Sequence, residues 1–219
     1  MRIAAISDIH GNRPALRAVF GDMPPVDLVV CAGDVVGYNP WPGACVSTVR
    51  DRSIPTVKGN HDRAVATGDT AGFNRLATEG VRFARNELNP DALEWLERLP
   101  DERTLVGGRV KVVHGHPADP DRYTYPRDFS PDLLTNEDVL VLGHTHVQHS
   151  EIYEDCLVCN PGSVGQPRDG DPRAAYAVID LDSLTVDECR VAYDIDTVER
   201  KIHTVGLPPR LGSRLHEGR

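Results

Sequence analysis

Aspartate, asparagine and histidine side chains recur directly after short apolar runs of this sequence, and these residue types bind metal ions and transfer protons. Five runs are followed in this way. In chain order, the groups are Asp8 and His10 after 3–6, Asp34 after 28–31, Asn60 and His61 after 55–58, His114 after 110–113, and His144 and His146 after 139–142. The pattern predicts that the fold brings these side chains to one place.

Without His61, the set contains two carboxylates, one amide and four imidazoles. Nitrogen and oxygen ligands without thiolate suit Mn²⁺, Fe or Zn²⁺ better than Ca²⁺. One ion needs only about three to six protein ligands, so seven groups suggest two ions that share a carboxylate. Two neighbouring ions lower the pKa of a shared water and stabilise the displaced oxygens of a phosphate ester.

The elements that would position these residues alternate between strands and helices, as in α/β folds, where ligands bind beyond the carboxyl ends of the strands. On extended segments, Asp8 and His10 would face the same side, as would His144 and His146. We expect strands at 3–7, 28–31, 56–58, 104–106, 110–113, 139–142, 150–160, 174–180 and 186–192. We expect helices at 14–20, 44–50, over most of 62–100, at 198–205 and at 209–216, and long loops at 115–131 and 160–168.

Composition limits the class of protein. The 219 residues, with 40% hydrophobic and 26% charged residues, fit one domain spanning 1–219. The net charge of -9 argues against a stable nucleic-acid complex. Five cysteines, an odd number, favour a reducing cytoplasm, and we expect neither a signal peptide nor a membrane span. The pair Cys156 and Cys159 lacks a second pair for zinc, which favours core packing.

The ordered motifs resemble those of the calcineurin-like metallophosphoesterases. The motifs are Asp8-x-His10, Gly33-Asp34, Gly59-Asn60-His61-Asp62, His114 and Gly143-His144-Thr145-His146. The segment 160–168, Asn-Pro-Gly-Ser-Val-Gly-Gln-Pro-Arg, resembles the small bacterial and archaeal phosphodiesterase branch of that superfamily. The resemblance therefore extends over most of the chain, and its motifs are specific as an ordered set.

This resemblance implies a four-layer αββα sandwich of two mixed β-sheets flanked by helices. It implies that one ion is held by Asp8, His10, Asp34 and His146, and a second by Asp34, Asn60, His114 and His144. Asp34 would bridge the ions, a bridging hydroxide would be the nucleophile, and His61 would protonate the leaving oxygen. We expect Mn²⁺, with Fe, Zn²⁺ or Ni²⁺ as alternatives. His116 is a second candidate for the place of His114, which directly follows its strand, and Asp62 is expected to cap a helix.

The resemblance favours a phosphodiesterase that hydrolyses small phosphate esters or nucleotides. A phosphomonoesterase, a protein phosphatase, a dinucleoside polyphosphate hydrolase and a non-catalytic scaffold of the same fold are the alternatives. Protein phosphatases of the superfamily usually carry an Asp-Arg pair three residues after the aspartate at position 34, which is absent here. Candidate substrate-binding residues are Asn12, Asn60, His61 and Arg168, and Tyr123 and Tyr125 could stack on an aryl group. The sequence is compatible with both a monomer and a homo-oligomer.

Overall fold

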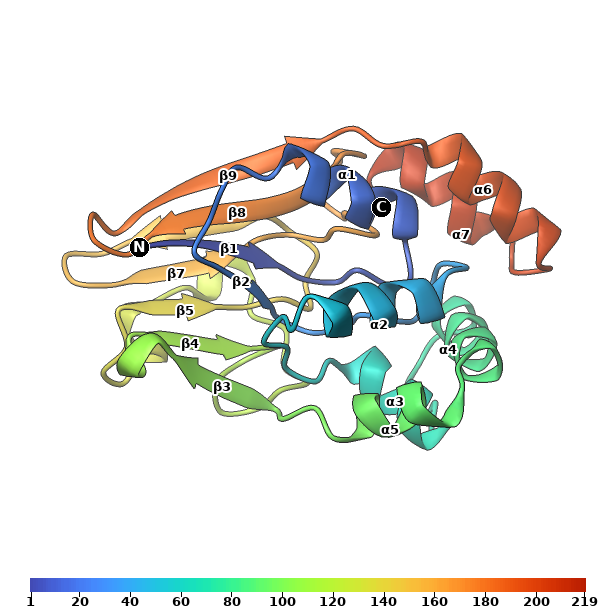
Figure 1. Ribbon diagram of the computed structural model, residues 1–219, viewed down its shortest axis with the longest axis horizontal. Helices are drawn as coiled ribbons and strands as arrows, with labels where there is room; N and C mark the ends of the chain where they lie inside the picture. The colour runs from blue at the N-terminus through green and yellow to red at the C-terminus, as the bar shows by residue number, and fades with distance from the viewer.

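Two mixed β-sheets form the centre of the computed structural model, which describes residues 1–219 (Figure 1). The first sheet has the order β2 (Leu28–Cys31), β1 (Arg2–Ile6), β8 (Ala174–Asp180), β9 (Thr185–Val191). The second has the order β3 (Glu102–Leu105), β4 (Val110–Val113), β5 (Val139–Val141), β7 (Leu157–Asn160), β6 (His149–Ile152). Each sheet mixes parallel and antiparallel pairs.

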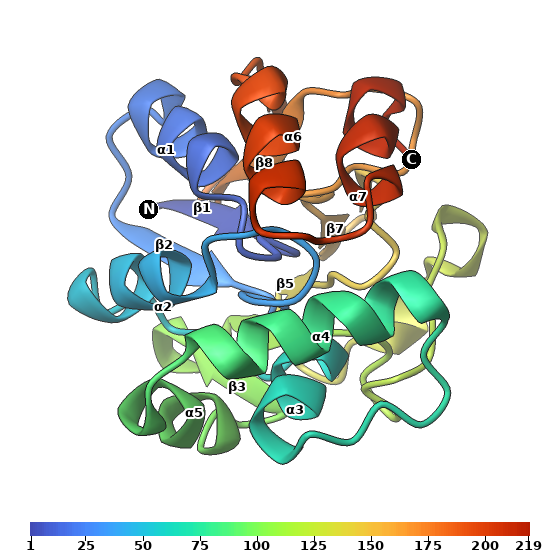
Figure 2. The same cartoon turned by 90° about the vertical axis from the view of Figure 1, so that its right-hand side faces the viewer.

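Seven α-helices surround the sheets, and four 3-10 helices lie in the connections (Figures 1 and 2). The α-helices are α1 (Arg13–Asp22), α2 (Pro42–Asp51), α3 (Asn60–Thr67), α4 (Arg75–Glu87), α5 (Pro90–Glu97), α6 (Ile195–Thr204) and α7 (Arg210–Ser213). The 3-10 helices are η1 (Val106–Gly108), η2 (Pro126–Asp128), η3 (Pro131–Leu133) and η4 (Arg214–Glu217). No helix combines the length and the apolarity that crossing a bilayer requires.

The alternation of side chains along each strand builds the layers. In β1, Ile3 and Ala5 pack between the two sheets, whereas Ile6 packs on the opposite face beneath α1 and α2. Because both faces are buried, the strand is apolar from Ile3 to Ile6 rather than alternating with polar residues. The outer face of the second sheet is covered by the segment containing η2 and η3, through Phe129 and its neighbours.

The sequence correctly predicted an α/β fold with two mixed sheets and flanking helices. The strand expected at 56–58 is wrong. Thr56 forms one isolated bridge with Cys31, and the chain then turns away: the Lys58 N–H bonds to the Pro100 carbonyl, and α3 begins at Asn60. The expected strand over 150–160 is a hairpin, in which Ile152 of β6 pairs with β7.

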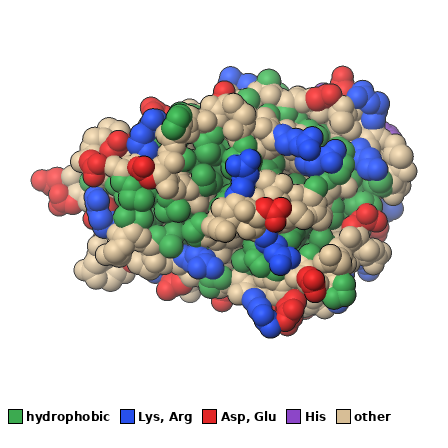
Figure 3. All heavy atoms as spheres, viewed as in Figure 1, with side chains coloured by type: hydrophobic (Ala, Val, Ile, Leu, Met, Phe, Trp, Pro, Cys, Tyr) green, Lys and Arg blue, Asp and Glu red, His purple; other side chains and the backbone are tan.

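The topology brings the carboxyl ends of five strands to one edge. Strands β1 and β2 are parallel, and so are β4, β5 and β7. Figure 1 shows that β1, β4, β5 and β7 point toward the end of the molecule where α2, α3 and α4 lie. On the face drawn in Figure 3, basic and acidic side chains are interspersed around exposed apolar groups, so neither sign of charge dominates that face.

Candidate metal centre

Tight loops beyond the strands, rather than extended segments, carry five of the seven candidate ligands. These five residues have left-handed backbone conformations, with φ of 52° at Asp8, 49° at His10, 55° at Asp34, 69° at His144 and 59° at His146. The expectation that Asp8 and His10, and likewise His144 and His146, lie on extended segments is therefore wrong, because β1 ends at Ile6 and β5 at Val141. The convergence itself is present in the structure.

The first group of side chains comprises Asp8, His10 and His146, which are buried, with Asp34 beside them. Asp8 Oδ1 lies 3.3 Å from His146 Nε2 and 3.7 Å from His10 Nε2. His10 Nε2 is also 3.6 Å from Asp34 Oδ2 and 3.1 Å from His146 Nε2. Four ligand atoms from three separate strand ends thus face one small space.

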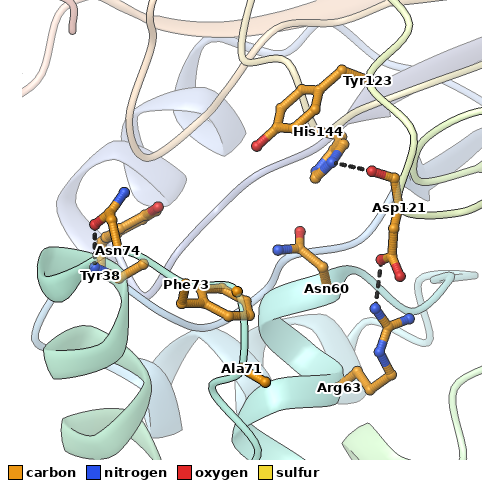
Figure 4. Close-up of a pocket in the computed structure, with 11 residues that line it drawn as sticks. Tyr38, Asn60, Arg63, Ala71, Phe73, Asn74, Asp121, Tyr123 and His144 are labelled. Carbon is orange, nitrogen blue, oxygen red and sulfur yellow. Dashed lines mark hydrogen bonds and ion pairs between the residues drawn. The ribbon is translucent and has the colours of Figure 1, made fainter.

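The second group shares Asp34 with the first. The same Oδ2 atom of Asp34 lies 3.4 Å from His114 Nε2, which is 3.2 Å from the amide oxygen of Asn60. The His144 ring is centred 4.8 Å from the His114 ring, and Figure 4 shows His144 and Asn60 on either side of the same opening. One carboxylate oxygen therefore faces both groups, as a bridging ligand would.

Backbone carbonyls hold one ring nitrogen of each of these four histidines. The contacts are His10 Nδ1 to Val36 O at 3.1 Å, His114 Nδ1 to Ala32 O at 2.7 Å, His146 Nδ1 to Gln166 O at 2.6 Å, and His144 Nε2 to Asp121 O at 3.1 Å. A carbonyl only accepts, so each of these nitrogens carries the proton and donates. The opposite nitrogen is left to bind a proton or a metal ion, which is the usual support of metal-binding histidines.

Electrostatics at the centre also fits bound cations. Burial alone would raise the pKa of Asp8 and Asp34, but the neighbouring histidines, chiefly His146 and His114 respectively, hold both values below the ordinary range. Burial lowers the pKa of His114, yet Asp34 outweighs it and raises the value to about 10. Burial lowers the pKa of His10 and His146. Their Nε2 atoms, 3.1 Å apart, are thus two lone pairs in contact, an arrangement that a cation would relieve.

Asp62 supports the shared carboxylate. Its Oδ2 accepts hydrogen bonds from the backbone N–H groups of Asp34, at 2.8 Å, and Gly59, at 3.1 Å, and its Oδ1 accepts from Val36 N–H at 3.2 Å. The bond to Gly59 confirms the predicted helix cap at the start of α3. The other two bonds were not predicted, and they fasten the Asp34 loop to this helix.

His61 lies beside both groups at the start of α3 and is buried. Its backbone N–H donates to Asp34 Oδ1 at 2.8 Å, which leaves Oδ2 free for the centre. Its ring is centred 4.8 Å from His10, 4.5 Å from Tyr38 and 4.8 Å from Phe73. Burial lowers the pKa of His61 to about 4, so the imidazole is neutral at pH 7.

The remaining predicted residues divide into supporting and peripheral ones. Asn12 is buried; its amide oxygen accepts from Ala15 N–H at 3.1 Å, and its NH₂ donates to Gly165 O at 2.9 Å, so it holds loops together. Arg168 donates to the Tyr38 hydroxyl at 3.2 Å. His116 lies outside both groups, and its Nδ1 accepts from a backbone N–H in its own loop.

A cavity of about 310 Å³ opens beside Asn60 and His144 (Figure 4). Tyr38, Phe73, Asn74 and Tyr123 line it, together with the ion pair of Arg63 and Asp121. The Tyr123 ring stacks on His144 at 3.9 Å and lies nearly parallel to Tyr125 at 5.9 Å. The cavity has room for a small ester next to Asn60 and His144 of the second group.

Sequence reasoning missed two aromatic residues of this cavity. Phe73 lies within the region expected to be mostly helical, 62–100, and its helical spacing from the apolar residues that follow is typical of core packing. In the structure α4 begins only at Arg75, and Phe73 lines the cavity. Tyr38 lies in the loop 37–43, whose glycines, prolines and aromatic residues are a signal for a shaped loop. Gly37 has φ of 136°, and a Cβ there would lie 2.6 Å from His61 Nδ1, so a glycine is required for this histidine to pack.

Comparison with known proteins agrees with this geometry. The calcineurin-like phosphoesterase superfamily domain matches residues 1–184. An uncharacterised protein of Methanocaldococcus jannaschii is 34% identical, over 99% of this chain and 98% of its own length. The phosphodiesterase YfcE of Escherichia coli K12 is 28% identical, over 85% of this chain and 91% of its own length.

A solved metallophosphoesterase from Sphaerobacter thermophilus superposes with a TM-score of 0.85, at 35% identity and full coverage of both chains. A hypothetical protein from Pyrococcus horikoshii OT3 superposes with a TM-score of 0.87 at 20% identity, over 100% of this chain and 98% of its own, which shows the fold alone. The matched domain covers most of the chain and contains all seven candidate ligands. The chain therefore belongs to the calcineurin-like phosphoesterase superfamily.

Proposed function

We propose that this protein is a phosphodiesterase that depends on two divalent cations. Asp8, His10, Asp34 and His146 would hold one cation. Asp34, Asn60, His114 and His144 would hold the other, with Asp34 shared. The observation that carries the proposal is the position of Asp34 Oδ2, 3.6 Å from His10 Nε2 and 3.4 Å from His114 Nε2, with both imidazoles anchored from behind by carbonyls. Of the candidate cations, Mn²⁺ is our first choice, ahead of Fe, Zn²⁺ and Ni²⁺.

Cations bound there would lower the pKa of a water molecule and offset the charge that develops on a phosphate ester. The protein's own part is to fix the ligands and to exclude bulk water. Asp8 and Asp34 are almost completely buried, so their charges are poorly screened by solvent. Asn60 and His144 lie at the cavity and orient the ester toward the buried part of the centre.

His61 is our candidate for the proton donor to the leaving oxygen. Burial disfavours the charged ring and lowers its pKa to about 4. A phosphate anion beside the ring favours the imidazolium, so a bound substrate would raise the pKa of His61 and favour its protonation. The bond from the His61 backbone N–H to Asp34 Oδ1 fixes the start of α3, which carries this ring.

The preference for diesters rests on the likeness to the phosphodiesterase YfcE and on the cavity, whose volume of about 310 Å³ suits a small ester. The activity is tested by hydrolysis of bis-p-nitrophenyl phosphate against p-nitrophenyl phosphate, after loading metal-free protein with Mn²⁺, Zn²⁺, Fe²⁺ or Ni²⁺. We expect metal-dependent turnover with a higher kcat/KM for the diester. A higher value for the monoester would favour a phosphomonoesterase instead.

Two histidines separated by one residue provide a matched pair of variants. His114→Ala should lose bound metal and turnover, because its Nε2 faces Asp34 and Asn60. His116→Ala should keep both, because its ring contacts its own loop. Wild-type protein that binds no metal and hydrolyses neither ester would contradict the proposal and favour a scaffolding role.

A further inference from the structure

Two arginines lie against one tyrosine at the border of the metal centre. The guanidinium carbon of Arg168 is 5.7 Å from the centre of the Tyr38 ring, and that of Arg214 is 5.8 Å from it. The same ring is centred 4.7 Å from the candidate ligand His10 and 4.5 Å from His61. Arg168 and Arg214, which we call the arginine pair, are therefore one aromatic ring away from the reaction centre.

Neither arginine of the pair contacts the carboxylate of an aspartate or glutamate. No ion pair within 4 Å joins either residue to an acidic side chain, although the chain carries a net charge of -9. Arg168 donates to two neutral groups, the Tyr38 hydroxyl and the side-chain oxygen of Gln166, and its buried Nε has no partner. Arg214 donates from Nε to the main-chain oxygen of Arg219, the last residue of the sequence.

This arrangement costs free energy in the absence of an anion. Burial and the like charge of Arg168 both lower the pKa of Arg214, which means that the surroundings disfavour its cation. Half-buried charges normally lie beside an opposite charge. Two neighbouring like charges without one are a feature found at functional sites. A bound anion would offset the repulsion between the two guanidinium groups.

The arginine pair also has a route to the substrate cavity. A groove of about 460 Å³ runs between the start of α4 and the C-terminal helices α7 and η4, and three arginines (Arg210, Arg214 and Arg219) and Glu217 line it. Asn74 lines both this groove and the cavity at the metal centre, so the two spaces are neighbours that share this residue. Figure 2 shows α4, α6 and α7 at the end of the molecule that faces the viewer.

We propose that Arg168 and Arg214 bind a second anionic group of the substrate, so that this phosphodiesterase prefers esters that carry another phosphate. This inference rests on the proposed function, of which it names the substrate class. Guanidinium groups bind phosphate through paired, charge-assisted hydrogen bonds, which the geometry of a lysine cannot provide. Arg214 lies beyond residues 1–184, which the superfamily domain covers, so this preference would be a property of the C-terminal helices.

Two esters that differ in a single phosphate test this proposal. Both are p-nitrophenyl esters of thymidine 5′-phosphate, and one of them also carries a 3′-phosphate. Both release the same chromophore from the same diester, so the ratio of their kcat/KM values isolates the second anion. We expect the 3′-phosphate to raise kcat/KM about tenfold or more, the range of one or two hydrogen bonds to a charged group.

Arg214→Met keeps an unbranched apolar chain against Tyr38 and removes the charge, so we expect it to lower this ratio toward one. The matched control is Arg200→Met, which removes the same charge from an exposed position on α6 and should leave the ratio and the rates unchanged. Thermal unfolding of each variant verifies folding. A wild-type ratio near one, or an equal fall in both variants, overturns the proposal.

A binding measurement keeps this inference separate from the proposed function. Calorimetric titration of metal-free protein compares thymidine 3′,5′-bisphosphate with thymidine 5′-phosphate, so it needs no catalysis. We expect tighter binding of the bisphosphate in the wild-type protein and in Arg200→Met, and loss of the difference in Arg214→Met. Failure of both esters to react would overturn the proposed function, whereas equal affinities for the two nucleotides would overturn the role of the arginine pair.

Discussion

Replacing Asp34 by asparagine changes one atom of the candidate metal centre. The Oδ1 atom, which accepts the His61 backbone N–H at 2.8 Å, can be retained as the amide oxygen. The Oδ2 atom, which faces His10 and His114, becomes an NH₂ group that donates and cannot bind a cation. The Asp34→Asn variant should therefore keep the loop and lose the ligand that the two groups share.

The size of the effect follows from the geometry. Removing one unit charge about 4 Å from another costs about 4 kcal/mol at an effective dielectric constant of about 20. That energy corresponds to roughly a thousandfold weaker binding for each unit of cation charge, and the cations are divalent. Asp34 is 1% exposed, so solvent does little to screen the loss. We expect at least one ion to be lost, and turnover to fall by about a thousandfold or more.

Metal analysis and kinetics together measure this effect. Bound metal is counted after dialysis by plasma mass spectrometry, and turnover is followed with bis-p-nitrophenyl phosphate at saturating Mn²⁺. Asp91→Asn is the matched control, since it removes the same charge from an exposed position at the start of α5. Circular dichroism and thermal unfolding show whether Asp34→Asn still folds. In its metal-free form the pKa of His114 should fall from about 10, because burial then acts without the opposing charge of Asp34, and histidine NMR detects this fall independently of any metal.

A folded Asp34→Asn protein that still binds two ions would refute the shared role of this carboxylate. Retention of more than about a tenth of the wild-type turnover would refute the energetic argument, because even one lost ligand charge predicts a larger effect. An unchanged pKa of His114 would show that Asp34 does not control this histidine. Each of these results is independent of the identity of the natural substrate.

Three further predictions address residues around the same centre. His61→Ala should keep both ions and slow diester turnover by roughly 10²–10⁴-fold, and unchanged turnover would remove His61 from the mechanism. Because Asp34 raises the folded-state pKa of His114 from 6.5 to about 10, the stability of metal-free protein gained from this pair should be complete below pH 6.5 and lost toward pH 10, as urea unfolding in EDTA measures. Gly37→Ala should lower turnover more than metal content, because the added carbon would lie 2.6 Å from His61 Nδ1 and 2.9 Å from His10 Nδ1; equal kinetics in the variant would contradict the packing argument.

The residue types and their places after apolar runs were sufficient to predict which side chains meet. Asp34 and His114 follow strands of different sheets, and a strand pattern alone places both at carboxyl ends. The pairing of two sheets across a shared core then brings those ends together, which the resemblance supplied and periodicity did not. The choice of His114 over His116 was also available from sequence, since only the former directly follows its strand.

Other features depend on contacts between distant segments, which local patterns do not contain. Thr56 was assigned to a strand because β-prone residues surround it, but only one bridge forms before the chain enters α3. Phe73 has the spacing of a core residue, yet it lies before its helix and contacts His61. Arg214 is more than 40 residues from Arg168, and nothing in either segment predicts that they share the ring of Tyr38.

The backbone conformation of the ligand loops opposes the local preferences of their residues, and such conformations are common at functional sites. A non-glycine residue in the left-handed region raises the free energy of the folded state by on the order of 1–2 kcal/mol. His10, His144 and His146 therefore destabilise these loops at positions where glycine would not. Hydrogen bonds from other loops offset this cost: the His10 N–H bonds to Asp34 O at 2.9 Å, and the Gly165 N–H bonds to Asp8 O at 2.9 Å. The loops are thus held by contacts that need no cation. Conformations that oppose local preference are found where geometry matters more than stability, and here the geometry directs imidazole nitrogens at one carboxylate.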